Sequence, residues 1–306
     1  MNARRRGSGG EKRGLALCLA WVPCLALAAA EPSQGGDPAL KLLRDASLML
    51  LREGNQRFVA GKSQHPNLDA ERRTNTVAHG QEPFATILAC SDSRDPVELL
   101  FDRGVGDLFV VRVAGNIVGL SELASIEYGV GHLGTPLLVV MGHTRCGAVT
   151  AVVKGADLHG HLPRLADHIK PAAERALAIT NQPDAAVPHA VQENVWQSIA
   201  DIFTKSSLIR ERAKAGKVHV EGAIYDLETG RVNWLGPHPE AASLHALPLE
   251  DPAHGEIADV PPPDEHAHEP PKTPPRSQGP ADRPPMNTET VLRALSKSEG
   301  EAEARH

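Results

Sequence analysis

The chain has 306 residues and a formal net charge of −6 at pH 7. Aromatic residues make up 3% of it, and it has no clustered basic segment that would neutralise phosphates, so nothing points to a nucleic-acid partner. Residues 37–236 mix apolar runs with polar segments in globular proportions, which predicts one folded domain with a sizeable core.

The first 30 residues have the pattern of a cleavable export signal. Basic residues at positions 4–6, 12 and 13 precede an apolar run from Leu15 to Ala30 that ends in small residues. Pro23 interrupts this run, which is shorter than the roughly 20 apolar residues that cross a bilayer, so a retained membrane anchor is the less favoured alternative. We therefore predict a signal peptide over residues 1–30, no stable membrane anchor, and a periplasmic or secreted protein. Both the general secretory and the twin-arginine routes stay open.

The first half of the domain is predicted to alternate helices and strands. Apolar residues at spacings of three and four over residues 39–62 indicate amphipathic helices that pack against the core or a partner subunit. Three short apolar runs then predict strands, each followed by glycine or a polar turn: "PFATILAC", "DLFVVRVAG" and "TPLLVVMG". Between the second and third strands, "LASIEYGVGHLG" has a helical pattern.

The second half of the domain is mainly helical. Helices are predicted directly after Cys146, over residues 161–178, and as a pair that breaks near Ser206. "KVHVEGAIYDLETGRVNWLG" then has the alternation of a β-hairpin around "LETG". The predicted fold class is therefore α/β, with a mostly parallel central sheet flanked by helices and an antiparallel edge strand.

The composition changes at Pro237. Residues 237–306 are rich in proline and poor in apolar residues, which predicts a largely disordered C-terminal tail with, at most, a marginal helix near its end. The predicted catalytic domain therefore covers residues 31–236.

Cysteine and histidine residues gather where the predicted strands end. Cys90 ends the first strand, and His143 and Cys146 follow the third, three residues apart. Ligand sites of parallel sheets lie beyond the carboxyl ends of the strands, and zinc takes thiolate and imidazole ligands in a tetrahedral arrangement. Three protein ligands with a fourth position free are typical of a catalytic zinc site.

A disulfide between Cys90 and Cys146 is the alternative to a metal site. Removal of residues 1–30 leaves these as the two cysteines of the exported chain, and cysteine pairs in oxidising compartments usually form disulfides. The position of His143 at ligand spacing favours the metal.

Asp92 and Arg94 follow Cys90 at alternating positions. In an extended or turning segment, residues two apart can point the same way, so the three side chains are expected to project together. Charge-assisted hydrogen bonds from an arginine keep a carboxylate ionised and oriented. Asp92 would then accept a proton from zinc-bound water, or itself ligate the metal; an ordinary surface ion pair is the alternative.

These motifs resemble those of the β-class carbonic anhydrases. The resemblance rests on "CSDSR", "GDLFVVRVAGN", "SIEYGV" and "GHTRCGAV", extends more weakly through "ENVW" and "GAIYDLETG", and covers roughly residues 39–236. It implies one Zn²⁺ per chain, ligated by Cys90, His143 and Cys146, with Asp92 and Arg94 as the acid–base dyad. It also implies a homodimer or a dimer of dimers, because the two aromatic residues of the pocket come from a neighbouring subunit in the family. The implied pocket residues are Gln81, Phe109, Tyr128 and Gly147.

The activity that the resemblance implies is the zinc-dependent, reversible hydration of carbon dioxide to bicarbonate and a proton, by attack of zinc-bound hydroxide. Two thiolate ligands cancel the charge of zinc. We therefore expect a less acidic bound water than the pKa of about 7 of the three-histidine carbonic anhydrase site, and activity that rises toward alkaline pH. His132 is one candidate for carrying the proton away. Members with a bicarbonate-regulated closed site carry tryptophan near the position of Phe58, so the open form is favoured.

Other functions stay open at this point. Relatives with the same ligands hydrolyse carbon disulfide or carbonyl sulfide. A non-catalytic zinc-binding protein would be favoured if the histidine-bearing tail bound metal as tightly as the core. A thiol redox protein is disfavoured because the sequence has no CxxC motif.

Overall fold

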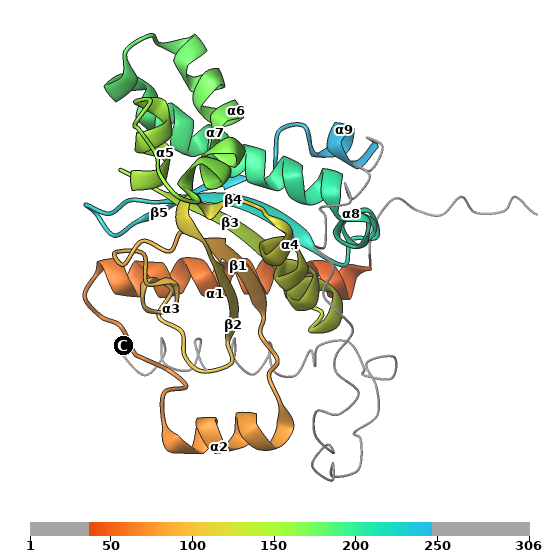
Figure 1. Ribbon diagram of the computed structural model, residues 1–306. Helices are drawn as coiled ribbons and strands as arrows, with labels where there is room; N and C mark the ends of the chain where they lie inside the picture. The colour runs from red at the N-terminus through yellow and green to blue at the C-terminus, as the bar shows by residue number, and fades with distance from the viewer. Residues whose placement is uncertain (1–36, 247–306) are drawn as a thin grey trace, which may run out of the picture. The chain divides into compact units, whose positions relative to one another are not determined.

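The computed structural model describes residues 37–246, which fold around a five-stranded sheet with the strand order β2-β1-β3-β4-β5 (Figure 1). The first four strands in the chain pair in parallel, and the last pairs antiparallel at one edge. The predicted α/β class, the strand positions and the antiparallel edge are confirmed. The strands are β1 (Ala85–Ala89), β2 (Leu108–Arg112), β3 (Leu137–His143), β4 (His219–Tyr225) and β5 (Val232–Gly236).

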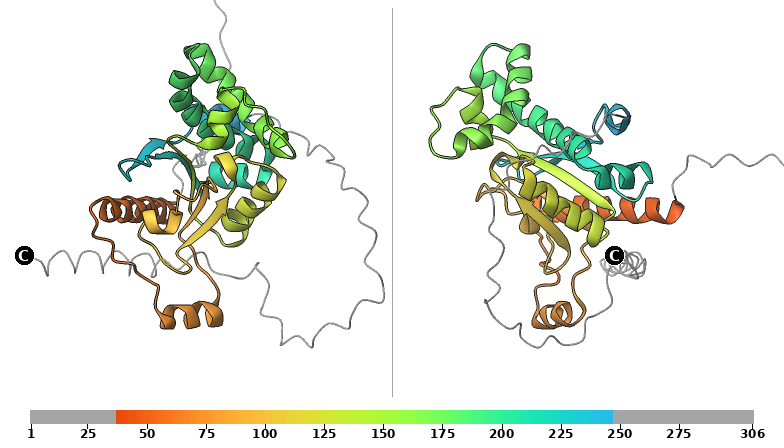
Figure 2. Two further views of the ribbon diagram at one scale, coloured as in Figure 1. Left: turned by 60° about the vertical axis from the view of Figure 1, so that its left-hand side comes forward. Right: turned by 45° about the vertical axis from the view of Figure 1, so that its right-hand side comes forward.

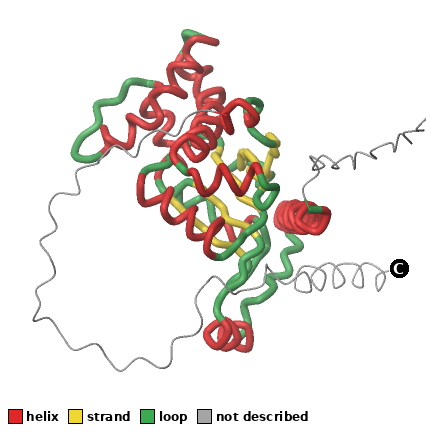
Figure 3. The backbone as a smooth tube through the Cα atoms, turned by 90° about the vertical axis from the view of Figure 1, so that its right-hand side faces the viewer, coloured by secondary structure: helices red, strands yellow, loops and turns green. Residues whose placement is uncertain are grey.

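Helices surround the sheet in the described part of the chain (Figure 3). In place of the several helices expected over residues 39–62, one continuous helix forms, whereas the break predicted near Ser206 is confirmed. The Ser206 hydroxyl accepts the backbone N–H of Ile209 and so caps the second helix of that pair. The helices and helical turns are α1 (Pro38–Val59), α2 (Ala70–His79), α3 (Val97–Leu100), η1 (Ala114–Asn116), α4 (Leu120–Glu127), η2 (Tyr128–His132), α5 (Gly147–Val153), α6 (Leu162–Ile179), α7 (Pro183–Lys205), α8 (Ser207–Lys214) and α9 (Ala241–Ala246).

Both faces of the sheet are buried. α1 and α3 pack on one face, where Leu51, Ile87 and Met141 are fully buried. α4 and α7 cover the other face, which includes Leu88 and Val140 (Figures 1 and 2). Successive strand residues point to opposite faces, so a strand covered on both sides is apolar throughout. This explains why the strands are continuous apolar runs in the sequence. Polar side chains are instead found where the parallel strands end, at the carboxyl edge of the sheet.

α2 was not predicted from the sequence. It buries none of its residues, so the apolar periodicity that marks a helix is missing. Its local signals are Asp69, which accepts the backbone N–H of Arg72 at the first turn, and Gly80, which follows the last turn at φ 84°. The Arg72 guanidinium and the Asn67 amide both donate to the carboxylate of Asp107 and tie this segment to the residue before β2.

The folded part extends past the predicted boundary at residue 236. α9 follows β5, and Leu244 is buried in the core that α7 closes. The rings of His238 and His245 lie edge-on to Trp196 and Phe203 of α7. A single buried leucine in the six-residue segment AASLHA gives too weak a periodicity to reveal such a short helix, which its contacts with α7 hold in place.

The predicted signal peptide and the rest of the predicted tail lie outside the described residues. Among residues 37–246, no helix is both long enough and apolar enough to cross a membrane.

Gly54 lets α1 approach the backbone that follows α3. A methyl group at this position would stand 1.8 Å from the carbonyl oxygen of Phe101. Alanine normally favours a helix over glycine by about 1 kcal/mol, but we expect Gly54→Ala to lower the free energy of unfolding by about 3 kcal/mol, measured by urea denaturation. Gly131→Ala is the control, because its methyl group would meet only the end of the Leu208 side chain. An equal loss of stability in both variants would contradict the explanation.

Candidate metal centre

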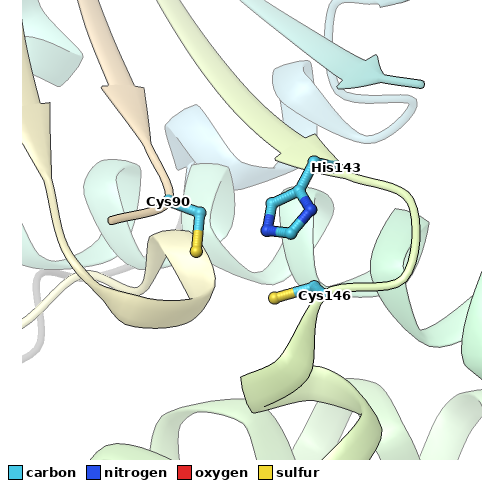
Figure 4. A group of neighbouring side chains, drawn as sticks. All are labelled: Cys90, His143 and Cys146. Atoms are coloured by element: carbon cyan, nitrogen blue, oxygen red, sulfur yellow. The ribbon is translucent and has the colours of Figure 1, made fainter. Parts of the chain in front are cut away.

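Three side chains converge at the carboxyl edge of the sheet. Cys90 follows β1, His143 is the last residue of β3, and Cys146 directly precedes α5 (Figure 4). Their sulfur and nitrogen atoms lie within 4.8 Å of one another, and no other cluster of this kind occurs among the described residues. All three side chains are buried, with 4%, 0% and 1% of their surface exposed. We call these three residues the metal cluster.

The turn from β3 into α5 presents two members of the metal cluster. Arg145 adopts the left-handed conformation with φ 56°, so the backbone reverses between His143 and Cys146. Thr144 fastens the turn to the segment after β4. Its hydroxyl accepts the backbone N–H of Leu227 at 3.0 Å.

The orientation of His143 leaves one ring nitrogen without a partner. Nδ1 lies 3.0 Å from the carbonyl oxygen of Thr144 and is the donor of this hydrogen bond. In a neutral imidazole the other nitrogen, Nε2, then carries a lone pair. Nε2 is buried and has no hydrogen-bond partner in the described part of the chain. A metal ion between the ring and the two sulfur atoms would satisfy it.

The two cysteines of the metal cluster have opposite pKa shifts. Both are free, so the predicted alternative of a disulfide between them is not formed. A hydrogen bond from Cys146, together with His143 and the backbone N–H of Gly115 at 3.3 Å, lowers the pKa of Cys90 to about 4. The same shared hydrogen bond raises the pKa of Cys146. Thiolate and neutral imidazole are preferred ligands of zinc, so these residues fit Zn²⁺.

Asp92 and Arg94 form a two-pronged ion pair beside the metal cluster. The guanidinium donates from Nε and Nη2 to the two carboxylate oxygens of Asp92, at 2.9 and 2.8 Å. This pairing lowers the pKa of Asp92 well below its ordinary range. Asp92 Oδ2 lies 3.8 Å from Nε2 of His143. The pair is therefore placed to act on a group held by the metal cluster.

Arg112 is a supporting residue that the sequence analysis did not single out. Its guanidinium donates to the carbonyl oxygens of Cys90 and Asp92, at 3.0 and 2.7 Å. These bonds fix the backbone between a metal ligand and the carboxylate. The only sequence signal was its place in "GDLFVVRVAGN", a segment of the family resemblance.

Asp95 is a second residue that the sequence analysis missed. Its side chain is fully buried, and neither carboxylate oxygen has a hydrogen-bond partner in the described part of the chain. Burial raises the pKa of Asp95 to about 7, and the nearby Cys90 thiolate adds to the rise, while His143 and Arg112 oppose it. The folded protein therefore holds a proton on this carboxyl group at pH values where the unfolded chain does not.

We expect Asp95→Asn to stabilise the metal-free protein increasingly as the pH rises. The unfolded carboxyl group ionises near pH 4 and the folded one near pH 7, so the free energy of unfolding of the native sequence falls through this window. The full effect is about 4 kcal/mol, at about 1.4 kcal/mol per pKa unit. Urea denaturation of chelator-treated protein should show the advantage of the variant growing by about 2 to 3 kcal/mol between about pH 5 and pH 8. A constant difference would contradict the assignment.

The predicted pocket residues fall into two groups. Gly147 begins α5 next to Cys146 and is exposed, and among the described residues outside its own helix and chain neighbours nothing stands within 4 Å of the position of a Cβ there. Phe109 and Tyr128 lie elsewhere, with ring centroids 5.7 Å apart. Phe109 pairs with Thr86 near the start of β1, which is about 13 Å along the strand from the metal cluster at roughly 3.3 Å per residue.

Gln81 is also remote from the metal cluster of its own chain. It is exposed and precedes β1, whereas the metal cluster follows β1. His132 stacks on Tyr128 with ring centroids 4.6 Å apart and so accompanies the aromatic pair. The chain therefore brings together the predicted metal ligands, the dyad and Gly147, but not Gln81, Phe109 or Tyr128.

Fold and site together define an α/β protein with a buried Cys-His-Cys cluster and an adjoining ion pair of Asp92 and Arg94 at the carboxyl edge of a parallel sheet. The family model for carbonic anhydrase matches residues 85–232. Carbonic anhydrase 2 of Mycobacterium tuberculosis is 40% identical over 188 residues, which cover 61% of this chain and 90% of that protein. The carbonic anhydrase of Mycolicibacterium smegmatis is 37% identical over 189 residues, which cover 61% and 91%.

A solved structure agrees with these relatives. The β-carbonic anhydrase CafA of Aspergillus fumigatus has a TM-score of 0.53 and 30% identity, over 64% of this chain and 96% of that one. The chain therefore belongs to the β-class carbonic anhydrase family, whose members are lyases. These comparisons do not favour the carbon disulfide or carbonyl sulfide hydrolase, or the non-catalytic zinc-binding protein.

Proposed function

We propose that the protein is a zinc enzyme that catalyses the reversible hydration of carbon dioxide to bicarbonate and a proton. The observation that carries the proposal is the metal cluster itself, in which a buried imidazole nitrogen, with no hydrogen-bond partner among the described residues, faces two cysteine sulfur atoms. The ion pair of Asp92 and Arg94 lies beside it. Membership of the carbonic anhydrase family supports the same reaction.

Cys90, His143 and Cys146 would hold the metal. Zinc bound there supplies a Lewis acid that makes a water molecule easier to deprotonate. Asp92, kept ionised by Arg94, offers a carboxylate oxygen as proton acceptor at the edge of the cluster.

We propose that the site works in the open form. Both carboxylate oxygens of Asp92 are engaged by Arg94, so ligation of the metal by Asp92 would break two charge-assisted hydrogen bonds. The regulated members of the family carry tryptophan near the position of Phe58, which supports the same choice.

We also propose a homodimer, alone or as a dimer of dimers. The aromatic pair of Phe109 and Tyr128 lies far from the metal cluster of its own chain, and Tyr128 is 44% exposed. A second chain would bring this pair to a metal cluster, as the family resemblance implies. Light scattering during gel filtration should give at least twice the mass of one chain, and a monomer with full activity would overturn this proposal.

Export is proposed from the signal-like pattern of residues 1–30. Fractionation of the host cell should find the protein in the periplasm or the medium. Recovery in the cytosol would remove the proposal without affecting the reaction.

Stopped-flow measurement of carbon dioxide hydration tests the function. We expect about one zinc per chain and activity that rises from about pH 6.5 to pH 9, because two thiolate ligands make the coordinated water less acidic than three histidines do. Cys90→Ser should lose both zinc and activity. Zinc binding without hydration at any pH would overturn the proposed reaction, leave the metal site standing, and make carbon disulfide and carbonyl sulfide the next substrates to assay.

A further inference from the structure

The segment "ENVW", residues 193–196 of α7, has no part in the function described so far. α7 lies close to the sheet because β3 and β4 carry glycine beneath it. A methyl group at Gly142 would stand 3.0 Å from Val195, and one at Gly222 would stand 2.7 Å from Trp196. This close approach brings the next face of α7, with Asn194, against the turn η1.

Asn194 and Ser198 hold η1 through its backbone. Nδ2 of Asn194 donates to the carbonyl oxygen of Gly115 at 2.7 Å, and the hydroxyl of Ser198 donates to the carbonyl oxygen of Asn116 at 2.9 Å. Asn194 and Ser198 are one helical turn apart and are 1% and 2% exposed. Oδ1 of Asn194 has no hydrogen-bond partner within the described residues. Within that part of the chain, the side-chain amide of Asn194 therefore bonds to Gly115 alone.

The backbone of η1 has a conformation that needs such support. Gly115 and Asn116 are both left-handed, with φ 74° and 44°. This conformation is unfavourable for a residue with a Cβ, such as Asn116. A methyl group at Gly115 would also stand 2.8 Å from Ile169. The conformation aims the backbone N–H of Gly115 at the sulfur of Cys90, 3.3 Å away.

We propose that Asn194 and Ser198 are positioning residues of the metal centre, which keep the Gly115 N–H on the Cys90 sulfur and so hold this ligand oriented as a thiolate. The inference rests on the proposed function, because it requires Cys90 to ligate a metal. Neither residue donates to the metal cluster itself; Asn194 acts through Gly115 and Ser198 through the adjoining Asn116 of η1. Partners that orient a metal ligand typically change metal affinity by about 10- to 100-fold when they are removed.

Two variants and two matched controls test the proposal in the full chain. Asn194→Ala and Ser198→Ala remove the two contacts to η1. Asn55→Ala is the control for the amide, because Asn55 is 6% exposed and also donates to backbone carbonyls, those of Leu100 and Gly230. Ser47→Ala is the control for the hydroxyl, because Ser47 is fully buried and donates to the carbonyl of Leu43. Both controls lie in α1, on the far face of the sheet from α7.

Zinc affinity is measured by competition with a chromogenic chelator, and thiolate-to-metal absorption is measured on Co²⁺-substituted protein. We expect Asn194→Ala to weaken zinc binding about tenfold and Ser198→Ala several-fold, with a shifted thiolate-to-cobalt band in both. The two controls should lose stability but stay within about twofold of the native affinity, with an unchanged band. If Asn194→Ala does not fold, Ser198→Ala decides, since it loses a single hydroxyl group.

Native affinity and an unchanged cobalt spectrum in the α7 variants would overturn the proposal, and so would equal losses in the controls. A native chain that binds no metal would overturn both this inference and the proposed function. A native chain that binds zinc but does not hydrate carbon dioxide would overturn the proposed function alone. The zinc affinities of the α7 variants and their controls would still decide whether Asn194 and Ser198 position Cys90.

Discussion

We expect Cys146→Ser to give a folded protein that holds almost no zinc and has lost carbon dioxide hydration by about a thousandfold or more. A serine hydroxyl is not ionised at neutral pH and does not replace a thiolate as a zinc ligand. The change also removes the thiol that lowers the pKa of Cys90. Zinc content by elemental analysis and stopped-flow hydration check the result.

Val149→Ala is the matched control for this loss. Val149 lies in the same helix, α5, and is 1% exposed, so its truncation also disturbs the packing beneath the metal cluster. We expect Val149→Ala to lose stability and keep its zinc. Retention of a full complement of zinc by Cys146→Ser would show that Cys146 is not a ligand.

Asp92→Asn separates proton transfer from metal binding. The amide keeps the shape of the carboxylate but does not accept the proton, so hydration should fall by about 10² to 10⁴ while zinc stays at about one per chain. Arg94→Ala should act in the same direction more weakly, because it removes the two charge-assisted hydrogen bonds that orient the Asp92 carboxylate.

Glu228→Gln provides the comparison for a surface ion pair. Glu228 pairs with Arg145 at 3.0 Å in the turn that carries the metal ligands, but both side chains are 74% exposed. Exposed pairs contribute little, so the activity should stay within about twofold of the native value. If Asp92→Asn behaved like Glu228→Gln, the pair of Asp92 and Arg94 would have no catalytic role.

The metal cluster could be predicted from the sequence because each of its signals is local. Cys90 ends an apolar strand, and His143 and Cys146 share one turn, so the rule that strand ends meet at one edge was enough to bring them together. The central strands and most helices followed from periodicity in the same way. The helices α2 and α9 were not predicted, because α2 buries no side chain and α9 buries a single leucine.

The supports of the metal cluster could not be predicted, because they depend on contacts between distant segments. Asn194 reaches Gly115 across 79 positions of the chain, and Arg112 reaches Cys90 across 22. No local spacing encodes such pairs. Asp95 shows a further limit, because its burial follows from the packing around it and not from the residue type.

The distance between the aromatic pair and the metal cluster of one chain has a genetic consequence in the proposed dimer. Each chain would contribute its cysteines and histidine to one site, and Phe109 and Tyr128 to the other. A chain defective in Cys146 and a chain defective in Tyr128 would each be inactive as a pure dimer. Co-expressed in one cell, the two alleles would complement each other, since half of the sites in a mixed dimer receive both intact parts.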